Sequence, residues 1–192
     1  ILAKYVDASL EDKHVAVINI GGRYFDHFLK LFDTQKSNYA VDKQVVCLTD
    51  RDPERKIGNG KFHKCYPFEY GIPNDNVEYK NHSQEPIDKY IAHEHIKFFS
   101  QEDGKGKTFE YDLALYNPKC KLLLTESMSN KSEIQKMMDL DESKTLGDCL
   151  ALLGNSKENE RIKGAIEALN DSWTDEEKKH AVIASRYLNS IG

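Results

Sequence analysis

The order of apolar positions predicts a strand, a helix and a second strand within the first fifty residues. The run over 15–20 is continuous, apolar and rich in β-branched residues, and it ends at Gly21-Gly22, which is typical of a strand buried on both faces. Apolar residues then recur at helical spacing, at Phe25, Phe28, Leu29 and Phe32. A second buried strand is expected over 44–48, and residues 1–10 read as the end of an amphipathic helix. Strand, helix and strand in this order predict a βαβ unit on a parallel sheet.

The remaining pattern predicts short elements, followed by helices. Residues 55–83 are rich in turn formers, with short edge strands expected over 62–68 and 76–79. We expect a helix over 87–95, a strand over 96–99, and a helix over 108–117 that stops before Pro118. From residue 120 onward the spacing is helical, and Thr174 with Glu177 forms a capping box for the last helix. Two apolar stripes mark these helices: Ile162, Ile166 and Leu169, then Ala181, Ala184, Leu188 and Ile191.

The sequence therefore predicts an α/β fold, with a mostly parallel sheet flanked by helices and an added helical region. We place the α/β core over 1–119 and the helical region over 120–192, either packed on the core or inserted into it. No internal repeat or low-complexity segment interrupts this organisation.

Composition narrows the classes of protein. The chain has 192 residues, is 39% apolar, and carries a net charge of −5. It is too apolar for a disordered tail and has no run of about 18 apolar residues that could span a bilayer. An acidic chain gives no general reason to bind nucleic acid, so such binding would need a local patch or a bound cation. The scattered cysteines predict reduced thiols in a cytoplasmic protein.

The strongest candidate for chemistry is the pair Asp50 and Asp52, which directly follows a predicted buried strand. Open α/β sheets bind ligands at this edge, and two close carboxylates repel unless a cation such as Mg²⁺ neutralises them. The alternative is structural, with Asp50 ending the strand and Asp52 opening a turn before Pro53.

A local run of basic residues follows the acidic pair, and its members are Arg55, Lys56, Lys61 and Lys64. These side chains could follow a phosphate backbone beside a metal site, or the segment could be a solvated loop.

Other motifs carry weaker signals. Gly21-Gly22 could approach a phosphate, but a tight turn is the simpler interpretation. Gly106-Lys107-Thr108 lacks the preceding glycine of a nucleotide-binding P-loop, because position 101 is Gln. His93 and His95 would point apart on a helix, so we interpret them as surface residues. Glu110 and Asp112 could simply suit the start of a helix.

The arrangement resembles the Toprim domain of the OLD-family (overcoming lysogenization defect) ATP-dependent endonucleases, of the Gabija-like kind. The likeness is carried by VINIGG over 17–22, LTDRDP over 48–53 and KTFEYDL over 107–113, together with the capped helix over 173–191. The resemblance implies a Mg²⁺- or Mn²⁺-dependent DNA endonuclease in which Asp50 and Asp52 hold the metal. Glu110 would supply a further carboxylate, with Asp112 as the alternative. The order and spacing of these stretches cover most of the chain, but the fold alone does not settle the chemistry.

The resemblance also implies partners and a setting. In the family, an ABC-type ATPase precedes the Toprim domain in the same polypeptide, the role is usually defence against phage, and the protein is a cytoplasmic homo-oligomer of bacteria or archaea. The family further uses a glutamate that we expect before Ile1 and a lysine that we expect after Gly192. Residues 1–192 alone are therefore expected to have little or no nuclease activity.

Two other classes remain open from the sequence. A haloacid-dehalogenase-like phosphatase also carries Asp-x-Asp after a buried strand, but its motif continues with Thr or Val two places after the second Asp, where Glu54 stands here. A non-catalytic module, whose helical region over 120–192 binds a partner or a second copy, is the other alternative.

Overall fold

The computed structural model describes residues 9–70, 76–169 and 172–191, and these divide into two compact units. The N-terminal unit comprises residues 1–47 and 93–97, and the larger unit comprises 48–92 and 98–192. The helix predicted over 1–10 falls almost entirely on residues 1–8, which lie outside the described residues.

The N-terminal unit has less regular structure than its sequence predicts. The strand expected over 15–20 is wrong: this stretch is not a strand, and Val17 and Ile18 are 78% and 70% exposed. A strand needs a neighbour to accept its backbone hydrogen bonds, and no described strand pairs with these residues. The predicted helix shortens to α2 (Asp26–Leu29), in which Leu29 is buried.

A polar contact inside the N-terminal unit corrects the interpretation of His93 as a surface residue. His93 is 5% exposed, and its Nε2 lies 3.3 Å from Oδ1 of buried Asp33. The other ring nitrogen, Nδ1, accepts the N–H groups of His95 and Ile96 at 3.1 Å each. The ring therefore connects the backbone at His95 and Ile96 to Asp33 in the turn after α2. The helix expected over 87–95 ends at Tyr90, so His93 lies outside it.

Two of the predicted strands pair with each other. β1 (Val45–Leu48) and β5 (Ile96–Phe99) form a two-stranded sheet. The N–H of Val45 bonds to the carbonyl of His95 and the N–H of Thr49 to the carbonyl of Phe99, a constant offset that makes the strands parallel. β1 is buried on one side only, since Val46 and Leu48 are 62% and 68% exposed, so the expectation of burial on both faces is wrong.

The second sheet is antiparallel and was not expected as such. It has the order β3-β2-β4, with β2 (Glu54–Ile57) between β3 (His63–Lys64) and β4 (Val77–Lys80). The prediction of a mostly parallel sheet is therefore corrected, and the described fold is mixed α/β with one parallel pair and one antiparallel sheet. A 3₁₀ turn, η1 (Pro67–Glu69), follows β3, and α3 (Gln84–Tyr90) follows β4.

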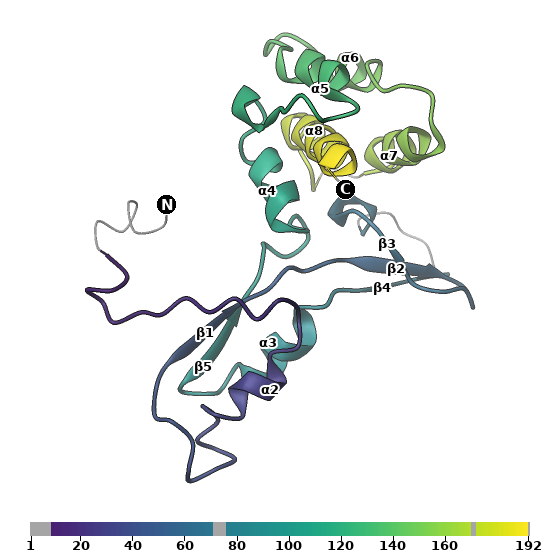
Figure 1. Ribbon diagram of the computed structural model, residues 1–192. Helices are drawn as coiled ribbons and strands as arrows, with labels where there is room; N and C mark the ends of the chain where they lie inside the picture. The colour runs from purple at the N-terminus through teal and green to yellow at the C-terminus, as the bar shows by residue number, and fades with distance from the viewer. Residues whose placement is uncertain (1–8, 71–75, 170–171, 192) are drawn as a thin grey trace. The chain divides into compact units, whose positions relative to one another are not determined.

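The helical pattern after β5 is confirmed in detail. Thr108 caps α4 (Phe109–Leu115) by accepting the N–H of Tyr111, as a helix over 108–117 requires. The later elements are η2 (Lys121–Leu123), α5 (Lys131–Met138), α6 (Leu146–Leu150), α7 (Lys157–Glu167) and α8 (Asp175–Ile191). Within the larger unit α8 is the central helix, and α4, α5, α6 and α7 all pack on it (Figure 1).

The main apolar core of the larger unit lies between these helices. Both predicted stripes enter it, since Ile162, Ile166, Ala181 and Ala184 are fully buried, although Ile191 at the end of α8 is exposed. Aromatic side chains from the strand side join it, with Tyr66 stacked on Phe68 at 5.1 Å between ring centroids. Other buried members come from α4 to α8: Tyr111, Leu115, Ile134, Met137, Met138, Cys149, Leu150, Trp173, Val182 and Tyr187.

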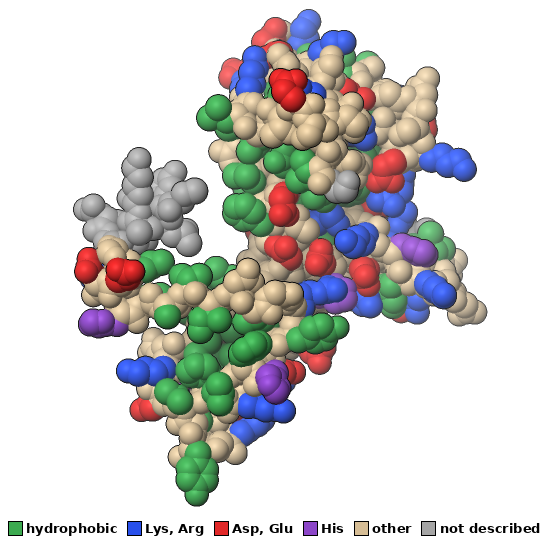
Figure 2. Space-filling model, in the orientation of Figure 1, with side chains coloured by type: hydrophobic (Ala, Val, Ile, Leu, Met, Phe, Trp, Pro, Cys, Tyr) green, Lys and Arg blue, Asp and Glu red, His purple; other side chains and the backbone are tan. Residues whose placement is uncertain are grey.

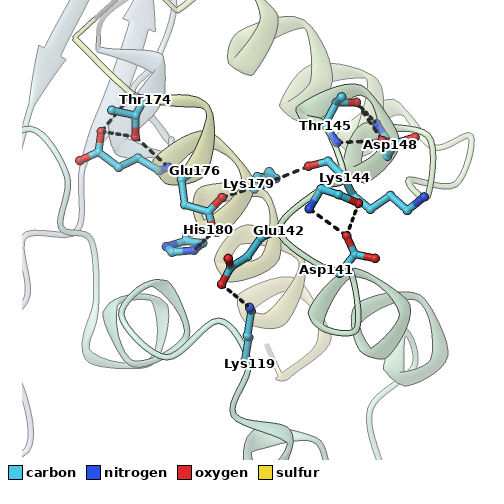
Figure 3. A network of polar contacts seen from close by, with 12 residues as sticks. Lys119, Asp141, Glu142, Lys144, Thr145, Asp148, Thr174, Glu176, Lys179 and His180 are labelled. Atoms are coloured by element: carbon cyan, nitrogen blue, oxygen red, sulfur yellow. Dashed lines mark hydrogen bonds and ion pairs between the residues drawn. The ribbon is translucent and has the colours of Figure 1, made fainter.

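Polar contacts fix the helix ends around α8 (Figure 3). The predicted capping box is confirmed, because Thr174 and Glu177 exchange side-chain to backbone hydrogen bonds. Lys179 of α8 donates to the carbonyl of Lys144 just before α6 and forms an ion pair with Glu176 at 2.6 Å. The bond from Lys179 links the N-terminal part of α8 to the loop between α5 and α6.

The four cysteines are free thiols: Cys47, Cys65 and Cys149 are buried, and Cys120 is half-buried. Among the described residues, no helix is both long and apolar enough to cross a membrane.

Candidate functional site

Asp50 lies where the sequence places it, at the carboxyl end of β1. Its Oδ1 accepts a hydrogen bond of 2.5 Å from the amide of Gln101 and one of 3.0 Å from the N–H of Phe109, the first residue of α4. Gln101 follows β5 closely, so the two parallel strands deliver both residues to the same sheet edge. Gln101 also accepts the N–H of Arg51 at 2.9 Å, which fixes the orientation of its amide.

The electrostatic surroundings of Asp50 are acidic. Burial raises the pKa of Asp50 above its usual value, and the negative charges of Asp52 and Glu110 raise it further. The hydrogen bonds from Gln101 and Phe109 oppose this shift, because they stabilise the ionised carboxylate. A cation placed among these acids would relieve the repulsion.

Arg51, between Asp50 and Asp52, is a buried residue. The Arg51 side chain is buried and donates to Asp103 and to the carbonyl of Gln101. Asp52 has a φ of +42°, a left-handed conformation that Asp tolerates better than most residues. Its N–H donates to the carbonyl of Lys107 at 3.1 Å, which joins the turn after β1 to the segment before α4.

The structure separates the candidate acids into two hollows. Asp50 and Asp112 line one hollow of about 430 Å³ together with Gln101 and Phe109, whereas Asp52 lines a different hollow. Glu110 is exposed on the first turn of α4, and neither hollow includes it. Burial, aided by the charges of Asp50 and Glu102, raises the pKa of Asp112 to about 6. Asp112 is thus the acid that shares a surface with Asp50, and Glu110 acts on Asp50 only through its charge.

The basic segment forms a hairpin, not a loop. Arg55 lies 3.1 Å from buried Glu69 and Lys56 lies 2.8 Å from Glu78, so both already form ion pairs. Figure 2 shows Lys and Arg side chains beside Asp and Glu side chains over the β2–β4 sheet. Lys61 precedes β3 and Lys64 is its last residue, and both side chains are exposed. These two lysines are the members of the run best placed to contact an external phosphate.

The hollow beside Asp52 is lined with cationic side chains. Its volume is about 410 Å³, and its lining includes Lys64, Lys107 and Arg161. Burial lowers the pKa of the Lys107 ammonium, while the charge of Asp52 opposes that shift. Arg161 comes from α7, so this hollow joins the strand side of the larger unit to its helical layer.

The carboxylate oxygens of the candidate acids are suitable ligands for a hard divalent cation, but the described side chains do not form a complete coordination site. In the described ranges, no three His, Cys, Asp or Glu side chains are grouped so that they could hold a metal ion together. Mg²⁺ is commonly held by one or two carboxylates, with water and substrate phosphate oxygens completing the shell. Asp50 and Asp52 are two carboxylates one residue apart at a sheet edge, but they line different hollows of the described structure.

Three residues of this region were missed from the sequence. Gln101 could have been found from its position just after the second parallel strand, the same reasoning that identified Asp50. Lys107 was considered only within the P-loop fragment and the stretch over 107–113, and Arg161 was not identified as a candidate. No local pattern indicates the last two, because their role depends on the contact between α7 and the η1 turn.

Comparison with protein-family models, with curated proteins and with solved structures finds no match to this chain.

Proposed function

We propose that this chain is the Toprim part of a metal-dependent DNA endonuclease, with Asp50 and Asp52 as its metal-binding carboxylates. Following the resemblance, DNA is the substrate, an ABC-type ATPase in the same polypeptide is the coupled domain, and antiphage defence in a bacterial or archaeal cytoplasm is the setting. A homo-oligomer is the proposed assembly.

The observation that carries the proposal is the acidic environment of Asp50 at the end of β1. Burial and the charges of Asp52 and Glu110 raise the pKa of this partly buried carboxylate, and carboxylates perturbed in this way are concentrated at functional sites. Mg²⁺ or Mn²⁺ bound there would polarise a phosphate oxygen and activate water. This chemistry requires oxygen ligands, and the candidate residues supply only oxygen ligands.

The residues of the chain have separable roles in this proposal. Gln101 and the N–H of Phe109 orient Asp50 by occupying its Oδ1. Asp112 extends the acidic surface of the same hollow, and its own Oδ1 accepts the N–H of Lys107 at 3.0 Å. Asp112 therefore fits the role of third acid at least as well as Glu110. Lys61 and Lys64 would contact the DNA backbone beyond the acids.

The direct test is nicking of supercoiled plasmid DNA in Mn²⁺, measured in the polypeptide that also carries the glutamate and lysine required by the resemblance. Asp50→Asn and Asp52→Asn should each reduce the nicking rate by at least about 100-fold, because each removes a metal ligand. Glu160→Gln changes an exposed acid of α7 and is the matched control. Nicking at the wild-type rate by both Asp variants would refute the proposal.

Two further measurements separate the alternatives. Comparing Glu110→Gln with Asp112→Asn in the same assay identifies the third acid, which should be the variant with the larger loss. Rapid turnover of p-nitrophenyl phosphate without DNA cleavage would instead indicate the haloacid-dehalogenase-like chemistry. We expect residues 1–192 alone to bind metal without fast cleavage.

A further inference from the structure

Lys107 is a buried cation on which Asp52 and Glu69 act through their charges, without an ion pair in the described part of the chain. Its residue surface is 5% exposed, and its Nζ donates to the carbonyl of Cys65 at 2.8 Å. The ring of Tyr66 lies beneath it, with 5.4 Å from Nζ to the ring centroid. Among the described residues no ion pair to Lys107 forms within 4.0 Å. A buried ammonium has three donors and a charge to satisfy, and the internal contacts satisfy one donor.

The hollow in front of Lys107 is large enough for a small ligand. It measures about 410 Å³, within the range of small-molecule sites. Lys64 enters it from β3 and Arg161 from α7, so cations reach it from three separate segments of the larger unit. Asp52 and Glu158 also line it, which leaves an excess of one positive charge in a chain whose net charge is −5.

Arg161 is held in place by contacts that leave one donor unused. Its guanidinium lies 3.4 Å from Glu69 and 3.3 Å from Glu158, and its carbon Cζ lies 5.5 Å from the centroid of the Tyr66 ring. The buried Nε has no hydrogen-bond partner in the part of the chain that is described. An oxyanion beside Arg161 and Lys107 would satisfy donors on both side chains.

We infer that Lys64, Lys107 and Arg161 form a phosphate-binding pocket beside Asp52. A phosphate group presents several acceptor oxygens in different directions, which suits donors arriving from three segments better than a planar carboxylate does. Resting on the proposed function, the bound group is a backbone phosphate of the nucleic acid next to the one at the acids. The pocket would then set which phosphate lies at Asp50 and Asp52.

The pocket is tested by calorimetric titration of residues 1–192 with inorganic phosphate, in chelator and without any divalent metal. Lys107→Met and Lys64→Gln should each weaken phosphate binding about tenfold, the factor for one lost charge-assisted hydrogen bond. Lys136→Gln removes an exposed lysine of α5 that does not line the pocket, and should leave the affinity unchanged. Lys64 is exposed, so its variant keeps the test valid even if Lys107→Met does not fold.

Thymidine and a thymidine dinucleotide without a terminal phosphate, which differ by one backbone phosphodiester and one nucleoside, test whether the phosphate belongs to a nucleic acid. Tighter binding of the dinucleotide, lost in Lys64→Gln, supports the inference. No phosphate binding, or equal binding by the wild type and both pocket variants, overturns it. The two proposals fail separately: Asp50→Asn should retain phosphate binding in chelator whether or not the protein cuts DNA.

Discussion

The N-terminal unit has a more apolar sequence than the helical layer around α8, but it has less regular structure. In the helical layer, most residues of the predicted apolar stripes are buried, as Ile162 and Ile166 show, and Ile191 at the end of α8 is the exposed exception. In the N-terminal unit, the most apolar run of the chain leaves Val17 and Ile18 exposed and has no strand. A helix satisfies its backbone internally and needs only a face to bury, whereas a strand also needs a neighbour along its edge.

The largest expected difference between the regions is the response to loss of an isoleucine side chain. Ile166→Ala should reduce the free energy of unfolding by about 2–5 kcal/mol, because it leaves a cavity in a closed core. Ile18→Ala, in the N-terminal unit, should change it by less than about 0.5 kcal/mol. Urea unfolding followed by circular dichroism measures both. A similar loss from Ile18→Ala would show that the segment over 15–20 is buried after all.

The N-terminal unit should nevertheless depend on one buried polar contact. Asp33→Ala leaves the buried ring of His93 without its acidic partner, and should destabilise the segments around both residues by about 1–3 kcal/mol. Asp42→Ala removes an exposed partner of His95 and is the matched control, with an expected effect below about 1 kcal/mol. Hydrogen exchange of the amides over 26–33 and 93–97 reports the difference, and equal exchange in the two variants would argue against the contact.

The helical core contains a buried hydroxyl group whose removal should increase the stability of the chain. The hydroxyl of Tyr111 is buried and has no hydrogen-bond partner in the described ranges, so Tyr111→Phe should stabilise the chain by up to about 1 kcal/mol. Tyr66→Phe is the contrasting variant, because the Tyr66 hydroxyl donates to Asn189 at 2.7 Å. It should destabilise the chain by about 1 kcal/mol. Thermal unfolding that moves in the same direction for both variants would contradict this assignment.

The smallest expected effect is the acid dependence of the start of α8. The ammonium of Lys105 and the N–H of Thr174 hold the pKa of Glu177 below its usual value of 4.5. A lowered folded-state pKa stabilises the protein above the unfolded-state pKa, and this contribution disappears as the pH falls through the folded-state value. Below about pH 4.5, the free energy of unfolding of Glu177→Gln should therefore fall less with decreasing pH than that of the wild type, by a few tenths of a kcal/mol. An unchanged slope would show that Glu177 does not titrate differently on folding.

The same contrast explains how much could be predicted from the sequence. The capped helices and the strands over 45–48 and 96–99 follow from local spacing, and each was placed within a few residues. β3 and β4 overlap the short strands expected over 62–68 and 76–79, and β2 was the strand that was missed. Its Arg55 and Lys56 are charged, and the ion pairs that they form with Glu69 and Glu78 depend on the folded structure. The run over 15–20 was misjudged because strand formation depends on a neighbour that a single segment cannot specify.

In the candidate site too, the residues that follow from local sequence could be predicted, and those that depend on tertiary contacts could not. Asp50 was predictable because position at the end of a buried strand is a local property of the sequence. The separation of Asp52 from Asp50 was not, because it follows from the left-handed turn at Asp52 and its bond to the carbonyl of Lys107. Arg161 joins the region only through the packing of α7 on the η1 turn, which no spacing rule describes.

Metal binding by Asp50 and Asp52 is the central claim, and electron paramagnetic resonance of free Mn²⁺ tests it without requiring catalysis. Titrating Mn²⁺ into residues 1–192 should show stoichiometric loss of the free-ion signal, with affinity at least about tenfold weaker in Asp50→Asn and in Asp52→Asn than in Glu160→Gln. Equal Mn²⁺ affinity in all three variants, or no binding by the wild type, would contradict the account.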